Sequence, residues 1–280
     1  MIAARQWRIG ERVVDLSQRG MIMGVLNVTP DSFSDGGRFV GLDSAVARGI
    51  AMAREGADII DIGGESTRPG AEPVNSDEEL RRVLPVIEKL RDKIDIPISI
   101  DTSKPRVAEA ALKAGAAIVN DVTAARDPEM LPLIRQRKCA CILMHMQGEP
   151  RTMQVAPHYH DVVAEVGEFF LQQYERALDC GIDPMGVAFD PGIGFGKTLT
   201  HNLELLRNLG RLRIADRPLA VGVSRKSFLG KLTEAPDVTD RLAPTIALTA
   251  LLRGRGADIM RVHDVKENLA ALRAAEALRP

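Results

Sequence analysis

Polar side chains stand at the ends of short apolar runs along the whole chain. The set comprises three carboxylates, two carboxamides, two imidazoles and a lysine: Asn27, Asp61, Asp101, Asn120, His145, Asp190, Lys226 and His263. Carboxylate and carboxamide oxygens accept hydrogen bonds and bind hard cations, whereas lysine and protonated histidine donate to anions and carbonyls. Any single Asn or Asp here could be an ordinary helix cap. Together the eight residues predict a polar cavity for a charged, hydrogen-bonding ligand.

The apolar runs alternate with segments of helical periodicity, so the elements that carry these residues can be placed. The predicted strands span residues 21–27, 58–63, 97–101, 116–121, 140–145, 186–190, 219–224 and 258–263. Their nearly continuous apolar character is typical of parallel strands buried on both faces. Eight strand–helix pairs favour one α/β domain, a (β/α)₈ TIM barrel over residues 21–280, with a short β-type extension over residues 1–20. An open doubly wound sheet is the alternative.

Two helix ends are predicted from capping signals. Ser76 is followed three residues later by Glu79, the capping-box pairing that satisfies free backbone N–H groups at a helix start. Pro105 and Gly115 predict the beginning and end of the next helix, because Pro favours the first turn and Gly the position after the last.

Composition indicates a soluble globular protein. Hydrophobic residues make up 45% of the 280 residues and charged residues 27%, which is far from a disordered composition. The net charge of -1 gives no general attraction to nucleic acid or to an anionic membrane. No apolar run of about 18 residues and no signal-peptide core occurs, so we expect a cytoplasmic protein without nucleic-acid or membrane partners. The three cysteines lack zinc-site spacing and receive no role.

Two further stretches could bind a ligand. FDPGIGFGKT, residues 189–198, is close to a P-loop, but Pro191 stands where the first glycine of that motif belongs. What remains is a glycine-rich turn whose backbone can approach a flat ligand closely. SRKSFLG, residues 224–230, places Lys226 after the seventh predicted strand, where barrels often bind anions. Lys226 suits either a Schiff base or a hydrogen bond to a heterocycle.

Eight stretches in order along the chain resemble the dihydropteroate synthase family. They are LNVTPDSFSDGG, GADIIDIGGESTRPGA, SIDTSKPRVAEAAL, IVNDVTA, LMHMQGEPRTMQ, FDPGIGFGKT, GVSRKSFLG and IMRVHDV. The resemblance implies condensation of 6-hydroxymethyl-7,8-dihydropterin diphosphate with p-aminobenzoate to 7,8-dihydropteroate and pyrophosphate, with Mg²⁺ as cofactor. It also implies a homodimer that sulfonamides inhibit.

The same resemblance implies a role for individual residues. For the pterin diphosphate they are Asp61, Thr67, Asp101, Asn120, Asp190, Lys226, Arg261 and His263, of which Asp101, Lys226 and Arg261 are catalytic. The implied Mg²⁺ ligand is Asn27. For p-aminobenzoate and the mobile loops they are Phe33, Ser66, Arg68, Pro69, Phe195 and Ser227. The residue types suit a reduced pterin, whose guanidine-like edge donates to carboxylate and carboxamide oxygens while a lysine donates to the ring carbonyl.

The implied mechanism is largely dissociative: pyrophosphate departs first, and Asp101 stabilises the cationic pterin methylene that then accepts the amine. Phe33 is the single large hydrophobe in the loop PDSFSDGG. We expect this loop to cover the p-aminobenzoate site and exclude water. The alternative is a phenylalanine tucked under its own loop.

Two other functions compete. A methyltetrahydrofolate:corrinoid methyltransferase has a similar pterin pocket but no diphosphate to hold, so Asn27 and the STRPG stretch favour the synthase. An inactive pterin-binding homologue is the second alternative, and the presence of the diphosphate and cation-stabilising residues argues against it.

Overall fold

The computed structural model describes residues 5–28, 38–66, 70–149, 151–234 and 237–279. Eight parallel strands are hydrogen-bonded in the order β8-β7-β6-β5-β4-β3-β10-β9, and a bridge between Phe189 and Leu219 joins the two ends of that order. The sheet therefore closes into a barrel without an exposed edge, which confirms the predicted fold and not the open sheet. The strands are β3 (Met21–Asn27), β4 (Ile59–Gly63), β5 (Ile98–Asp101), β6 (Ile118–Asp121), β7 (Ala140–Met144), β8 (Val187–Asp190), β9 (Ala220–Val221) and β10 (Ile259–Val262).

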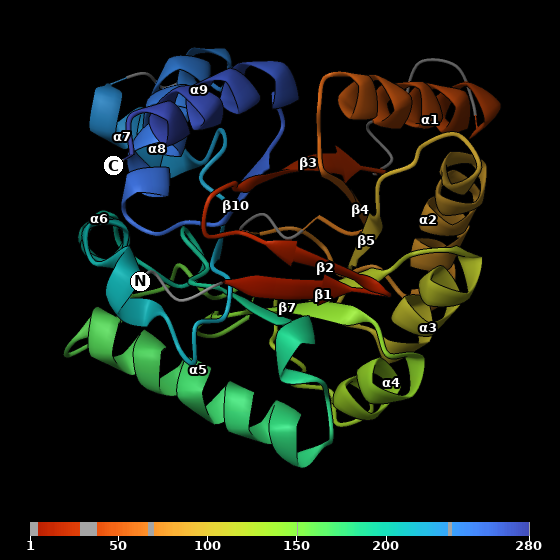
Figure 1. Cartoon of the computed structure of the whole chain (residues 1–280), viewed down its shortest axis with the longest axis horizontal. Helices are drawn as coiled ribbons and strands as arrows, with labels where there is room; N and C mark the ends of the chain where they lie inside the picture. Colours follow the sequence, from red (N-terminus) through yellow and green to blue (C-terminus); the bar gives the residue numbers. More distant parts are fainter. Residues whose placement is uncertain (1–4, 29–37, 67–69, 150, 235–236, 280) are drawn as a thin grey trace.

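Helices surround the barrel in chain order, as the view along its axis shows (Figure 1). The α-helices of the described residues are α1 (Arg38–Arg54), α2 (Ser76–Arg91), α3 (Pro105–Ala114), α4 (Met130–Arg137), α5 (Val162–Asp179), α6 (Leu199–Arg207), α7 (Ser227–Thr233), α8 (Leu242–Gly254) and α9 (Val265–Ala277). Short 3-10 helices cover Pro184–Gly186, Leu209–Leu212 and Thr239–Arg241. Within the described part of the chain, no helix has both the length and the apolar character to cross a bilayer.

Side chains alternate between two apolar layers along each strand. On β4, Ile60 and Ile62 belong to the large cluster between strands and helices, whereas Ile59 belongs to a separate cluster inside the barrel. Because the period is two, the next inward residue after Ile59 is Asp61, which is fully buried. The alternation thus directs polar residues into the barrel above an apolar layer.

The N-terminal extension is a hairpin that lies across one end of the barrel (Figure 1). Its strands β1 (Gln6–Ile9) and β2 (Arg12–Asp15) are antiparallel. Trp7 is fully buried in the inner apolar cluster, and its indole Nε1 donates to the carbonyl oxygen of Gly186 at 3.1 Å. The hairpin therefore covers the end where the strands begin, and the opposite end is left for a site.

The capping prediction for α2 is wrong by one residue. Asn75 is the N-cap, and its side chain accepts from the backbone N–H of Glu78, while Ser76 is already helical. Glu79 is turned into the protein and contacts Lys104 rather than the cap. The prediction for α3 is confirmed, because Pro105 begins that helix and Gly115 follows it with a φ of 123° that favours glycine.

Candidate active site

Strand register brings the predicted pterin residues together at the carboxyl ends of the strands. Asp61 of β4 lies beside Ser99 of β5, and Asp101 of β5 lies beside Asn120 of β6. Arg261 is on β10, which is separated from β4 by β3. Since inward residues of parallel strands form layers inside a barrel, residues up to 200 positions apart meet here.

Arg261 is held between two carboxylates. Its Nε donates to Asp61 Oδ2 at 2.6 Å and its Nη2 donates to Asp101 Oδ2 at 2.6 Å. Asn120 Nδ2 also donates to Asp61 Oδ2 at 3.1 Å. Two separate carboxylates fix the guanidinium plane, which orients it to stack on or donate to a ligand. The other oxygen of Asp61 and the hydroxyl of Ser99 are buried without a hydrogen-bond partner among the described residues.

Buried carboxylates and cations influence one another at this end of the barrel. Asp101 is influenced by Arg261 and by the like charge of Asp61, whereas Asp190 is influenced by Lys226 and Lys197. Burial raises the pKa of Asp101 to about 7, although the Arg261 guanidinium opposes the rise. Burial likewise raises the pKa of Asp190, against the opposing effect of Lys226. A ligand edge that donates hydrogen bonds to these carboxylates would favour their ionised form.

The turn after β8 is built for a close approach of backbone segments. Asp190 accepts from the backbone N–H of Gly192 at 2.7 Å. Gly192 has a φ of 64°, and a Cβ there would lie 1.9 Å from the carbonyl oxygen of His145. Only glycine fits both constraints. The turn therefore fixes the Asp190 carboxylate at the cavity while the chain continues toward Phe195.

Lys226 is half-buried beside this turn. Its Nζ donates to the carbonyl oxygen of Ile193 and lies 4.6 Å from the centre of the Phe195 ring. Burial lowers the pKa of Lys226 to about 8, although Asp190 opposes the change. The ammonium is thus the predominant form at neutral pH and is available as a donor.

An apolar wall adjoins the polar groups, and of its residues only Phe195 was predicted from the sequence. Phe195 packs against a buried cluster of Val122, Met144, Met146 and Met153. Methionine side chains adapt to irregular surfaces and make favourable contacts with aromatic rings. The inward alternation on β7 was the available signal for Met144.

His145 was predicted to face the cavity, and this is wrong. Its ring packs edge-on against Phe169 of α5 at a centroid distance of 4.8 Å, outside the barrel. Nδ1 of His145 is 2.9 Å from Nζ of Lys197, and burial lowers the pKa of this imidazole to about 3. Lys197 is itself buried and also donates to the carbonyl oxygen of Phe195 at 2.9 Å. The pair joins the turns that follow β7 and β8.

The remaining predicted residues lie at the same end of the barrel where the structure describes them. Asn27 ends β3 with an exposed side chain, Ser66 follows β4, and Ser227 begins α7 with an exposed side chain. His263 follows β10, and its Nδ1 is 3.0 Å from Ser224 Oγ. Four predicted residues lie outside the described residues: Phe33, Thr67, Arg68 and Pro69.

The donor set at this end suits a metal ion that arrives with its ligand. Among the described residues, no group of three or more His, Cys, Asp or Glu side chains could hold a metal ion. Asn27 offers one carboxamide oxygen. Mg²⁺ keeps several waters and commonly takes only one or two protein oxygens in addition to substrate phosphates. The residues therefore fit Mg²⁺ bound together with a diphosphate.

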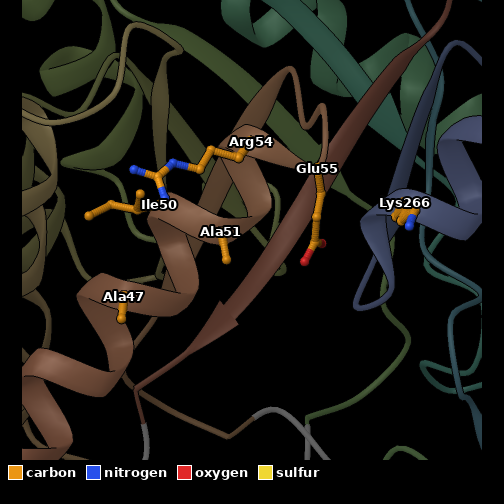
Figure 2. Close-up of a pocket in the computed structure, with 6 residues that line it drawn as sticks. All are labelled: Ala47, Ile50, Ala51, Arg54, Glu55 and Lys266. Carbon is orange, nitrogen blue, oxygen red and sulfur yellow. The ribbon is translucent and has the colours of Figure 1, made fainter.

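A groove on the outer surface is separate from these residues. It lies between α1 and the start of α9 and is lined by Ala47, Ile50, Ala51, Arg54, Glu55 and Lys266 (Figure 2). Glu55 already accepts from Arg48 Nη1 at 2.7 Å. The groove thus draws on the helical layer, whereas the chemistry described above draws on inward residues of the strands.

Comparison with known proteins decides the family. Residues 23–263 match the model of the pterin binding enzyme family. A dihydropteroate synthase of Synechocystis is 47% identical over 271 residues, which cover 96% of this chain and 94% of that protein. The chain belongs to the dihydropteroate synthase family. The corrinoid methyltransferase alternative is therefore not supported.

Solved structures of dihydropteroate synthases have the same fold. The enzyme of Xanthomonas albilineans with 4-aminobenzoic acid has a TM-score of 0.92 and 44% identity, covering 99% of this chain and 100% of that one. The enzyme of Yersinia pestis in a complex with a sulfonamide drug has a TM-score of 0.91 and 43% identity, covering 97% and 98% of the two chains. The likeness to dihydropteroate synthases therefore extends over the whole barrel.

Proposed function

We propose that this chain condenses 6-hydroxymethyl-7,8-dihydropterin diphosphate with p-aminobenzoate, giving 7,8-dihydropteroate and pyrophosphate. The observation that carries the proposal is the Arg261 guanidinium fixed between Asp61 and Asp101 at 2.6 Å from each. An arginine in that position can lie against a flat ring and neutralise a departing phosphate. Family membership supports the same reaction.

The pterin ring is recognised by groups of complementary polarity. The Asp190 carboxylate and the side-chain carboxamide oxygen of Asn120 accept hydrogen bonds from the guanidine-like edge of the pterin. Lys226 donates a hydrogen bond to the ring carbonyl. The buried Asp61 Oδ1, which has no partner among the described residues, is a further acceptor toward the same edge. Phe195 and the neighbouring methionines provide the apolar wall against the ring.

Asn27, Arg261 and His263 bind the diphosphate, and Asn27 would hold the Mg²⁺ that accompanies it. When bound, the metal would supply electrostatic stabilisation of the charge that develops on pyrophosphate. Arg261 contributes a second positive charge at the same end, and its pKa is raised above the usual value because Asp61 and Asp101 outweigh the opposing effect of burial. Arg261 therefore stays charged throughout the reaction.

Asp101 stabilises the positive charge that forms on the pterin methylene when pyrophosphate leaves. Its side chain is held in place by Arg261 and lies at the inner face of β5. A carboxylate already fixed in position needs little rearrangement as the charge appears. The aniline nitrogen of p-aminobenzoate then adds to the methylene and loses its proton.

The p-aminobenzoate site is formed by Ser66, Phe195 and Ser227 with the loop residues Phe33, Arg68 and Pro69. Ser227 is exposed at the start of α7, next to Lys226, and its hydroxyl can donate to the carboxylate. We expect sulfonamides to compete for this site. The Yersinia pestis relative in complex with a sulfonamide drug supports that expectation.

A homodimer is part of the proposal, and α8 supports it. Ala243, Ala247 and Leu251 follow one another at four-residue intervals and are exposed, with Leu251 at 56%. Such an apolar stripe at helical spacing is typical of a protein interface. Leu251→Glu should convert the dimer to monomers in sedimentation velocity, with Leu278→Glu as the control at another exposed leucine. A monomeric wild-type protein would contradict the dimer.

A cytoplasmic location is also proposed. The free, buried thiols of Cys139 and Cys141 suit a reducing compartment, where such thiols persist.

The decisive experiment measures pyrophosphate release from the pterin diphosphate with and without p-aminobenzoate and Mg²⁺. We expect release that requires Mg²⁺ and a dihydropteroate product that requires p-aminobenzoate. Pterin binding by calorimetry without any pyrophosphate release would instead indicate an inactive pterin-binding homologue. Methyl transfer to cobalamin would contradict the synthase.

A further inference from the structure

An ionic cluster outside the barrel interior joins the segment after β4 to the start of α3. Lys104 Nζ donates to Glu65 Oε2 and to Glu79 Oε2, the latter at 2.7 Å. Glu79 is fully buried, and its Oε1 has no hydrogen-bond partner among the described residues. One ammonium thus serves two carboxylates from different parts of the chain.

Glu65 connects the two ends of the segment that spans residues 64–74. Its Oε2 accepts from Lys104, and its Oε1 accepts from the backbone N–H of Val74 at 2.9 Å. Ser66, a proposed p-aminobenzoate residue, directly follows Glu65. Because Ser66 is the next residue along the backbone, the contacts that hold Glu65 also restrain the position of Ser66.

The start of the same segment is packed tightly on α2. A Cβ at Gly64 would lie 2.8 Å from Val83 Cγ1 and 3.0 Å from Glu79 Cγ, so only glycine permits this approach. Arg82 Nη1 also donates to the carbonyl oxygen of Gly64 at 2.7 Å. The backbone is thus restrained at Gly64 and the side chain of Glu65 is restrained by Lys104.

Lys104 lies between this segment and β5, the strand that carries Asp101. It is the N-cap residue of α3, and its backbone N–H donates to Thr102 Oγ1 at 3.2 Å. Thr102 follows Asp101, and its own N–H donates to the carbonyl oxygen of Asn120 at 3.1 Å. Lys104 is therefore anchored to the β5 and β6 ends that carry pterin residues.

Stability alone does not account for the cluster. A buried ion pair is often no more stabilising than apolar residues of similar volume, because both charges lose their hydration. Hydrogen bonds to Glu65 and Glu79 raise the pKa of Lys104 above its usual value, even though burial acts in the opposite direction more strongly than either bond. The side chain therefore remains an ammonium and keeps its directional contacts.

We propose that Lys104 is a positioning residue for p-aminobenzoate binding. By holding Glu65, it fixes the segment that carries Ser66 relative to the strand that carries Asp101. It acts on the p-aminobenzoate side and leaves recognition of the pterin unchanged. The inference rests on the proposed synthase function.

The first test is steady-state pyrophosphate release by Lys104→Met with each substrate varied in turn. We expect the KM for p-aminobenzoate to rise about tenfold, as loss of a hydrogen bond between charged groups predicts, while the KM for the pterin diphosphate changes less than about twofold. Glu65→Gln should show the same split. The combination of both substitutions should raise this KM no further than Lys104→Met alone, because both disrupt the same Lys104–Glu65 contact.

Lys113→Met is the matched control. Lys113 is an exposed lysine on the same helix, paired with Glu109 at 2.8 Å. Both KM values should stay at the wild-type level, since an exposed pair on a helix surface contributes little.

Lys104→Met leaves the buried Glu79 without its cation, which destabilises the fold. Lys104→Met combined with Glu79→Leu removes both charges and restores an apolar environment. The double variant should melt near the wild-type temperature and still show the raised KM for p-aminobenzoate.

Two results overturn the inference while the proposed function stands. One is a folded, active double variant whose KM for p-aminobenzoate is unchanged, and the other is an equal rise in both KM values. Wild-type protein that releases no pyrophosphate would overturn the proposed function and this inference with it.

Discussion

The two ends of the barrel treat buried polar groups differently. At the hairpin end, the fully buried Asp258 accepts from Arg5 at 2.9 Å, from Arg213 at 2.8 Å and from Arg253 at 3.2 Å, and also from the backbone N–H of Leu219. At the opposite end, Asp61 keeps one buried oxygen without a partner among the described residues.

The same eight strands build both ends, so the difference does not come from the fold. A buried carboxylate that stabilises the fold has its hydrogen bonds made by the protein itself, because an unsatisfied buried oxygen costs free energy. A carboxylate that binds a ligand can keep one oxygen without a protein partner, because the ligand donates the missing hydrogen bond. We therefore predict that substitutions at the hairpin end change the free energy of unfolding. Substitutions at the opposite end, where the carboxyl ends of the strands lie, should change the kinetic constants of the reaction.

Trp7→Ala should give the largest effect and test the hairpin end. Loss of this buried side chain is expected to lower the free energy of unfolding by about 3–5 kcal/mol, with KM values unchanged in the folded protein. Denaturant unfolding measures the loss. Val13→Ala, at an exposed position of the same hairpin, is the control and should stay within about 0.5 kcal/mol. A Trp7 variant of normal stability but poor turnover would refute the division.

Asp101→Asn tests the other end. We expect kcat to fall about a hundredfold, or ~3 kcal/mol, because one well-placed electrostatic group is commonly worth that much. Pterin binding in calorimetry should change far less. The free energy of unfolding should stay within about 1 kcal/mol of the wild type, since the amide has the shape of the carboxylate and Arg261 keeps its bond to Asp61. Unchanged turnover would remove Asp101 from its proposed role.

The pH dependence of kcat/KM should follow Asp101 and Lys226, two site residues whose pKa values are shifted toward neutrality. The pKa of Asp101 is raised to about 7, so acidification below that value neutralises the carboxylate and should lower kcat/KM about tenfold per pH unit. The pKa of Lys226 is lowered to about 8, so kcat/KM should fall again above it as the ammonium loses its proton. Asp101→Asn should abolish the acid limb only, and Lys226→Gln the alkaline limb only. An acid limb that persists in Asp101→Asn would assign it to another group.

The fold and most of the site residues' positions could be predicted because both depend on local pattern. Continuous apolar runs marked the strands, and the polar residues at their ends, such as Asp61, marked the end of the barrel where the site lies. The position of His145 was wrong by one residue: Met144 takes the inward position at the end of β7, and the His145 ring packs against Phe169 of α5. In a strand, one position changes the face.

Contacts between distant segments could not be predicted from pattern. Lys104 contacts Glu65 and Glu79, which are 39 and 25 positions away in the sequence. Nothing in the spacing of these residues along the sequence indicates that the buried glutamate pairs with this lysine. Lys197 was read as part of a failed P-loop, yet it contacts the imidazole of His145. Such pairs depend on how helices and turns pack, which local sequence does not determine.

Substitution at the α2 N-cap should have the smallest effect on stability. It also tests whether residues at the site end of the barrel contribute to stability. Asn75 caps α2 directly after the segment that carries Ser66, and its side chain accepts from the backbone N–H of Glu78 at 2.9 Å. Asn75→Ala should lower the free energy of unfolding by about 1 kcal/mol, whereas Ser76→Ala, the cap favoured by the sequence pattern, should change it by only a few tenths of a kcal/mol. Urea unfolding of both variants distinguishes the two positions. A larger loss of unfolding free energy for Ser76→Ala than for Asn75→Ala would support the predicted capping box of Ser76 and Glu79 instead. The expected result would show that the strand-end side of the barrel also contributes stability, through helix caps rather than through the residues that face the ligand.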